Sequence, residues 1–174
     1  MAMNVRLPPF ADGRFPTASG KVELYSQTLA DLGADPLPGA FVDRLDQADA
    51  NGHDLTEAME LITGASHHFV SSSLASQPGI LKTAGTPFVE IHPADAAKRG
   101  IQNGDTVEVE NSRGSCWLRA VLTENVRQGV IVSPKGRWAK LDGGRNVNWT
   151  TPDALADLNG QSTFHSNRVW VRKV

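Results

Sequence analysis

Two polar segments of this sequence carry side chains suited to holding a phosphorylated or heterocyclic ligand. The first follows a short apolar run at 61–63 and begins with a glycine, which lets backbone amides approach a phosphate closely. Its hydroxyl and imidazole groups supply further donors. The alternative is an ordinary polar loop after a strand. The candidate binding residues here are Gly64, Ser66, His67, His68 and Ser72.

The second segment, 135–149, combines local positive charge with an aromatic ring and side-chain amides. It holds four basic residues against one acidic residue, Asp142, and positive charge on a glycine-containing loop suits a pyrophosphate. A tryptophan can stack on a ring, and an asparagine both donates and accepts at the edge of a heterocycle. A solvated loop whose charge only aids solubility is the alternative. The candidates are Lys135, Arg137, Trp138, Asn146 and Asn148.

The sequence offers no catalytic or metal-binding motif of its own. His67 and His68 are adjacent, so on a strand they would point to opposite faces. The other histidines lack the usual ligand spacing. A single cysteine, Cys116, excludes a disulfide framework, a thiolate zinc site and an iron–sulfur cluster. We therefore assign no catalytic residue and expect no metal bound directly by this chain.

Length and charge narrow the class of protein. The chain has 174 residues and a formal net charge of −2, which argues against a broad nucleic-acid surface. No apolar run approaches the roughly 18 residues of a membrane span, so we expect no membrane contact. We predict an irregular N-terminal extension or linker at 1–58, polar and acidic over 43–58, and one folded domain at 59–174.

Short alternating runs between turn signals predict a mainly β fold with short helices. We expect strands at 61–63, 88–92, 106–110, 116–122, 129–132 and 167–171, and one more at 21–25. Helical turns are expected at 26–32, after Pro93, and after Thr151, which would cap a helix with Pro152 at its first position. About six short strands indicate a closed or partly closed barrel.

Several residues are assigned to the fold. Val107, Val109, Ile131 and Val169 should form the core, with Ile101 closing it. The acidic side chain of Asp105 should accept hydrogen bonds from turn amides. Asp95 should favour the N-terminal end of a short helix. Arg113 is likewise assigned to the fold.

Four stretches of the chain together resemble a known family. They read LITGASHH, FVEIHPADAAKRGIQNGDTVEVENSRGS, LTENVRQGVIVSPKGRW and NVNWTTPDALADLNGQSTFHSNRVWV. The series resembles the C-terminal cofactor-binding domain of molybdopterin oxidoreductases of the dimethyl-sulfoxide-reductase type. FPTASGKVELYS is similar to the segment that precedes that domain. The resemblance implies a six-stranded double-psi β-barrel, the fold shared with aspartate-decarboxylase-like barrels.

The same resemblance implies a cofactor and adds candidate residues. The cofactor would be molybdopterin guanine dinucleotide, with molybdenum or tungsten held by another domain. Asn148 matches the asparagine of the family's Asn-x-x-Thr signature, although Trp149 replaces its usual leucine, and Ala65 stands where many members have arginine. The family's last loop also reaches the cofactor, which adds Gln161, Phe164 and Asn167, with His165 weaker. Loops 64–72, 135–149 and 161–167 should then form one surface.

The resemblance also marks what this chain lacks. Cys116 falls in an expected hairpin strand, so we do not interpret it as the family's metal ligand. The chain alone should not be redox-active. We expect a fragment or separate subunit of a molybdopterin-dependent oxidoreductase, partnered by the remaining domains or the catalytic subunit. Substrate and compartment, cytoplasmic or periplasmic, stay open.

Two other functions remain possible from the sequence. Similar barrels serve as protein-binding adaptors, and fold alone does not set function. An adaptor would present an exposed apolar groove. Other related barrels are decarboxylases that cleave themselves at a Gly-Ser pair, and Gly114-Ser115 is such a pair. The pair falls in an expected hairpin, however, where Gly-Ser is common turn chemistry, and we favour that explanation.

Overall fold

The computed structural model describes residues 9–37, 54–155 and 160–174, and the chain divides into two compact units, Met1–Val42 and Asp43–Val174. In the described part of the first unit, α1 spans Gln27–Asp31, and the hydroxyl of Ser26 accepts from the Leu29 N–H at its start. This confirms the expected helix. The expected strand at 21–25 is wrong: these residues form bends and segments without regular structure.

Local hydrogen bonds explain the missing strand. The Thr17 hydroxyl donates to the carbonyl of Lys21 at 2.6 Å, and the Glu23 carboxylate accepts from the Ser19 N–H at 2.9 Å. Alternating residues form a strand only beside a partner strand, and here the side chains fasten a turn instead. Residues 43–53 of the predicted linker lie outside the described ranges, and the predicted boundary at 58 stays a prediction.

The second unit contains a closed barrel of six strands, in the order β1-β5-β2-β4-β3-β6. The pairs β1/β5 and β2/β4 are parallel, and the other pairs are antiparallel. This confirms the mainly β class and the double-psi β-barrel. The strands are β1 (Met59–Ile62), β2 (Phe88–Ile91), β3 (Thr106–Asn111), β4 (Gly114–Leu122), β5 (Val130–Val132) and β6 (Arg168–Lys173).

The inside of the barrel is apolar, as the alternation predicts. Val107, Val109, Ile131 and Val169 are each 0% exposed, and Ile101 is 4% exposed. Alternate residues of each strand face inward because side chains on a strand point to opposite faces. The thiol of Cys116 is also inside, and burial, helped by the charge of Glu108, raises its pKa to about 12.

The strand directions and registers define two rims of the barrel. At one rim, which we call the helix rim, β2 leads into α3 (Pro93–Lys98) and β4 leads through a short turn into β5. The Asp95 carboxylate accepts from the Gly129 N–H at 2.7 Å. Asp105 accepts from the Gln102 N–H at 2.8 Å, which confirms its expected role in the turn.

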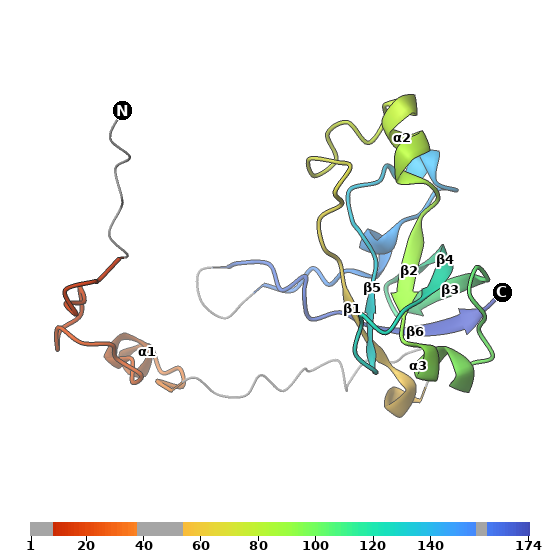
Figure 1. Ribbon diagram of the computed structural model, residues 1–174. Helices are drawn as coiled ribbons and strands as arrows, with labels where there is room; N and C mark the ends of the chain where they lie inside the picture. The colour runs from red at the N-terminus through yellow and green to blue at the C-terminus, as the bar shows by residue number, and fades with distance from the viewer. Residues whose placement is uncertain (1–8, 38–53, 156–159) are drawn as a thin grey trace, which may run out of the picture. The chain divides into compact units, whose positions relative to one another are not determined.

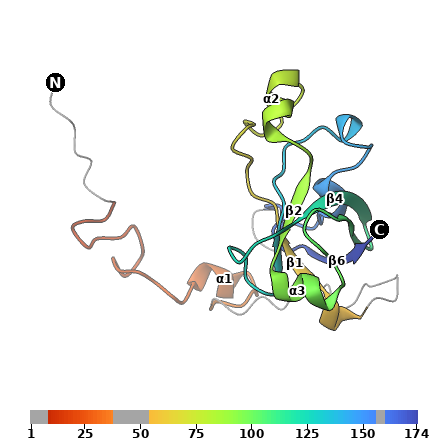
Figure 2. The same cartoon turned by 45° about the vertical axis from the view of Figure 1, so that its right-hand side comes forward.

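The opposite rim, which we call the loop rim, carries the connections β1–β2, β3–β4 and β5–β6. Two of them are long. The first contains α2 (Pro78–Ala84), which the sequence did not predict, and the second contains short 3-10 turns at Ala139–Leu141 and Val147–Thr150. In both views α2 and the light-blue segment that follows β5 lie at the end of the barrel away from α3 (Figures 1 and 2). A further 3-10 turn, Leu55–Glu57, precedes β1.

The helix expected after Thr151 is absent from the described residues there. A 3-10 turn comes earlier instead, because the side chain of Asn146 accepts from the Asn148 N–H at 3.0 Å and so caps Val147–Thr150. Thr151 follows that turn in an extended conformation, and 151–154 have no regular structure. The asparagine side chain five residues earlier, rather than the threonine, determines where the helical turn begins.

Candidate functional site

The first two candidate segments lie against each other at the loop rim. The Lys135 N–H donates to the carbonyl of Gly64 at 3.0 Å, and Ala65 forms an isolated parallel bridge with Lys135. Farther along, the indole N–H of Trp138 donates to the carbonyl of Ser72 at 3.2 Å. Two loops about 70 residues apart in the sequence are therefore held together by a backbone hydrogen bond and by a side-chain donor to a backbone carbonyl.

Gly136 lies at the closest approach of these loops. A Cβ atom at this position would lie 2.3 Å from the carbonyl oxygen of Ser71, far inside van der Waals contact. Its φ of +105° is also one that side-chain-bearing residues rarely adopt. The contact therefore requires glycine.

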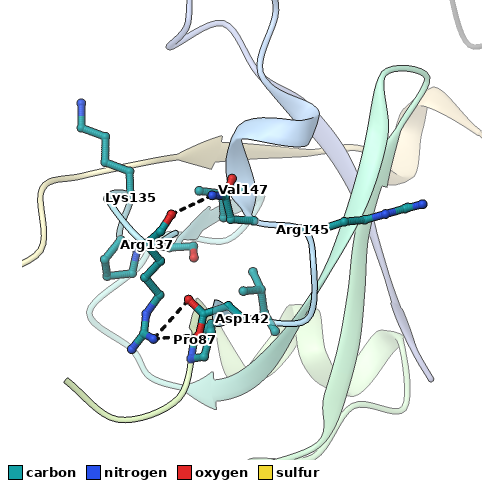
Figure 3. Close-up of a pocket in the computed structure, with 11 residues that line it drawn as sticks. Pro87, Lys135, Arg137, Asp142, Arg145 and Val147 are labelled. Carbon is teal, nitrogen blue, oxygen red and sulfur yellow. Dashed lines mark hydrogen bonds and ion pairs between the residues drawn. The ribbon is translucent and has the colours of Figure 1, made fainter. Parts of the chain in front are cut away.

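Arg137, a candidate cofactor-binding residue, is enclosed by the loops of the rim. Its guanidinium pairs with the Asp142 carboxylate at 3.1 Å and donates to the carbonyl of Gly85, just after α2. The ring of Phe69 lies 5.7 Å from it. The two charged side chains are only 11% and 9% exposed, and Figure 3 shows them turned toward each other. Contact between Arg137 and a cofactor stays a prediction; in this structure the side chain links three parts of the rim.

Lys135 and Arg145 point away from that ion pair (Figure 3). The ammonium of Lys135 lies 5.3 Å from the centre of the Phe164 ring, which joins the third candidate segment to the other two. Arg145 donates to the hydroxyl of Ser115 at 3.0 Å, at the start of β4. The three segments thus meet at one rim, as the family resemblance implies.

The asparagines of the rim differ in what they can offer a ligand. Asn146 donates to the carbonyl of Arg137 at 2.8 Å, so both ends of its amide already have partners. Asn148 is exposed, and within the described ranges no hydrogen bond of its side chain is found. Asn167 is 1% exposed and bonds to Thr150. Of the three, Asn148 presents a side chain to solvent.

The remaining candidates line the outside of the rim. Gly64 has open space where a side chain would be, and Ser66 accepts from the His68 N–H at 3.1 Å. The side chains that face solvent here belong to His67, His68, Ser72, Trp138 and Gln161. Sequence reasoning missed Phe69 and α2. An aromatic residue within a polar loop was the one available signal for Phe69.

The electrostatics of the rim suit an anionic ligand. Segments 64–72, 135–149 and 161–167 contain one carboxylate, Asp142, and Arg137 neutralises it. Lys135, Lys140 and Arg145 then leave an excess of positive charge near the exposed donors. This donor set fits a pyrophosphate-linked dinucleotide. In the described part of the chain, no group of three or more His, Cys, Asp or Glu side chains could hold a metal ion.

This fold and rim define a ligand-binding double-psi barrel, and comparison with known proteins identifies its family. Residues 59–168 match the family model described as "Molydopterin dinucleotide binding domain". The match covers more than half of the chain, so the chain belongs to the molybdopterin dinucleotide-binding domain family of oxidoreductases. The expected cofactor, molybdopterin guanine dinucleotide, is the class of ligand that this family binds.

Curated relatives include whole enzymes that are several times longer. The chain is 38% identical over 170 residues to the probable oxidoreductase YoaE of Bacillus subtilis, covering 97% of this chain and 24% of that protein. It is 32% identical to the dimethyl sulfoxide reductase DmsA of Escherichia coli, covering 91% of this chain and 21% of that one. The chain thus spans about a quarter or less of these relatives.

Solved structures support the fold. Acetylene hydratase from Pelobacter acetylenicus superimposes with a TM-score of 0.71 at 24% identity, over 93% of this chain and 24% of that one. At this identity the likeness concerns the fold alone. Among the described residues, no helix has the length and hydrophobicity that crossing a membrane requires.

Proposed function

We propose that the loop rim holds molybdopterin guanine dinucleotide within a molybdenum or tungsten oxidoreductase, together with other parts of that enzyme. The observation that carries this proposal is the meeting of three segments, distant in sequence, at one rim of a barrel from this family. The cofactor would supply the redox chemistry when bound. This chain's own residues would bind and orient it.

These rim residues have chemistry that suits separate roles. Lys135 is placed to neutralise a phosphate, and its own contact with Phe164 orients it. The amide of Asn148 is suited to the edge of a guanine or pterin ring. His67, His68, Ser72 and Gln161 would add donors, and the exposed Trp138 indole would cover a ring. These assignments are proposals for each residue separately.

The experiment is Asn148→Ala in the complete molybdoenzyme that contains this domain. We expect about tenfold faster loss of cofactor during dialysis, because a side chain that meets the ligand edge is removed. Retained cofactor is measured as molybdenum and as GMP released by acid hydrolysis, per mole of polypeptide. Circular dichroism and urea unfolding should be unchanged, since Asn148 is exposed.

Asn125→Ala is the matched control. Asn125 is an exposed asparagine in the turn before β5, at the helix rim, so its removal should leave cofactor retention unchanged. Equal retention in the Asn148 and Asn125 variants would overturn the role of Asn148. Equal loss in both would point to a general effect on the barrel and would also count against the proposal.

A further inference from the structure

A cluster of polar side chains is buried where the loop rim joins the barrel. Asn111 at the end of β3, Thr150 in the 3-10 turn and Asn167 before β6 are 5%, 0% and 1% exposed. Burying polar groups is costly unless each has a partner. Here all are paired, because the described residues contain no buried side-chain nitrogen or oxygen without a hydrogen bond.

Asn111 is the centre of this cluster. Its amide nitrogen donates toward the carbonyl of Thr150 at 2.8 Å and toward the amide oxygen of Asn167 at 3.1 Å, with the carbonyl of Arg168 at 3.2 Å. Its own oxygen accepts from the Arg113 N–H at 3.0 Å. One side chain therefore connects the β3–β4 hairpin, the 3-10 turn and the approach to β6.

Thr150 carries the connection into the turn. Its hydroxyl accepts from the Asn167 amide at 3.0 Å and donates to the carbonyl of Val147 at 2.8 Å. The turn is also fitted against the hairpin: a Cβ on Gly114 would lie 2.9 Å from the carbonyl oxygen of Trp149. The backbone of Val147–Thr150 is thus held from inside the barrel.

The two residues between these fixed ends are exposed. Asn148 and Trp149 lie in the middle of the turn, and Trp149 is 43% exposed. Apolar side chains in place of Asn111, Thr150 and Asn167 would fill the same buried space at a lower desolvation cost. A fully satisfied polar cluster instead fixes one geometry, because each bond has a direction. The cluster is therefore suited to determining where Asn148 and Trp149 point.

We propose that Asn111 and Thr150 are positioning residues, which with Asn167 fix the Val147–Thr150 turn so that Asn148 and Trp149 are aligned for the cofactor. The inference rests on the proposed function. Asn167, which the sequence suggested as a direct cofactor contact, is assigned here to holding the turn through its bonds to Thr150 and Asn111. Supporting groups of this kind commonly alter ligand retention by 10-fold or more when they are lost.

The test compares Thr150→Val with Thr150→Ser in the complete molybdoenzyme. Thr150→Val keeps the shape but removes the hydroxyl, and we expect about tenfold faster loss of GMP-containing cofactor on dialysis. Thr150→Ser retains the hydroxyl and should restore retention. Hydrogen exchange of the Trp149 and Thr151 amides, which donate to Asn146 and Asn148 carbonyls, should accelerate in the valine variant only.

A variant of the opposite rim separates positioning from general stability. Asp95→Asn weakens a buried polar contact to Gly129 and should lower the urea midpoint without changing cofactor loss. If Asp95→Asn and Thr150→Val release cofactor equally, the positioning role is overturned. Asn111→Asp, which removes the donor at the centre of the cluster, provides the same comparison should Thr150→Val fail to fold.

A double variant distinguishes this inference from the proposed function. If the cluster acts through the exposed turn, Thr150→Val should add little to cofactor loss in an Asn148→Ala/Trp149→Ala background. If the background variant loses cofactor and Thr150→Val alone does not, the positioning inference fails and the proposed function stands. If the background variant retains cofactor normally, the role of this turn in the proposed function fails.

Discussion

The two rims of the barrel are built in different ways. At the helix rim, acidic side chains bond to backbone amides of short turns: Asp105 holds Gln102, and Asp95 holds the residue just before β5. At the loop rim, the contacts join long, distant segments, such as Trp138 with Ser72 and Arg137 with Gly85. One rim is held chiefly by short turns, and the other by the packing of loops.

This difference fits a division of roles. Short turns fixed by carboxylates leave little freedom, so the helix rim is suited to supporting the barrel. Long loops that lie on one another can present exposed donors at a chosen spacing, which is why binding residues are often found on loops carried by a rigid scaffold. Substitutions at the two rims should therefore have separable effects on stability, loop opening and ligand retention.

The largest expected effect comes from Gly136→Ala at the loop rim. The added methyl would meet the Ser71 carbonyl at 2.3 Å and the residue would keep a strained φ of +105°. We expect the contact between the loops to weaken by about 3 kcal/mol, from overpacking and strain together. Limited proteolysis and hydrogen exchange of residues 64–72 measure the opening.

Gly129→Ala at the helix rim is the control. Gly129 also has positive φ, +80°, but no atom lies within 4 Å of its added Cβ. Only the backbone strain remains, so about 1 kcal/mol is expected. Equal effects of the two substitutions would mean that the close approach at Gly136 contributes nothing.

Breaking the Arg137–Asp142 pair is expected to be next in size. Arg137→Met leaves the Asp142 carboxylate, 9% exposed, without its cation, and we expect about 2 kcal/mol less protection of the loop rim. Arg137→Met/Asp142→Leu should recover much of that loss, since no charge is then stranded. Hydrogen exchange of the loop amides measures the protection in both variants. A double variant with less protection than either single variant would contradict a stabilising role of the Arg137–Asp142 pair.

A smaller effect, on the pH dependence of stability, is expected from Asp105 at the helix rim. The ion pair with Lys173 and the Gln102 N–H lower the pKa of Asp105 below its ordinary 3.8. A lowered folded-state pKa means that the carboxylate stabilises the fold above the ordinary value and loses that effect as pH falls through the folded-state pKa. Wild type should therefore exceed Asp105→Asn in urea midpoint at neutral pH, and the difference should vanish in strong acid.

The smallest expected effect is a near absence of thiol reactivity. The raised pKa of Cys116, about 12, and its 1% exposure leave almost no accessible thiolate at pH 8. Labelling should occur only when the barrel opens. Gly136→Ala should leave the labelling rate unchanged, whereas Asp95→Ala should raise it, and rapid labelling of the wild type would show that the core is not closed.

Sequence reasoning predicted the parts of the fold that depend on local pattern. The alternation of 106–110 gave a strand with Val107 and Val109 inside, and Asp105 was assigned to the turn that it holds. It was wrong at 21–25, where alternation had no partner strand, and at Thr151, where Asn146 capped an earlier turn. In both places a local polar side chain outweighed the pattern.

The candidate site divides in the same way. Residue types and the family resemblance identified the three segments. Neither of them could predict which hydrogen-bond or ion-pair partner each side chain has. Arg137 has the same residue type as Arg145, yet one is enclosed by Asp142 and Phe69 while the other reaches Ser115. Asn167 and Asn148 are likewise both asparagines, one buried and one exposed.

By itself the sequence determined the barrel, its core and the chemical character of the rim, because side-chain periodicity, turn residues and charge are properties of neighbouring positions. Only the tertiary structure decided which polar groups remain available to a ligand. That choice depends on which loops come together, through contacts such as Asn111 with Asn167, 56 residues apart. A donor or acceptor that is already hydrogen-bonded within the protein in such a contact is not available to a cofactor.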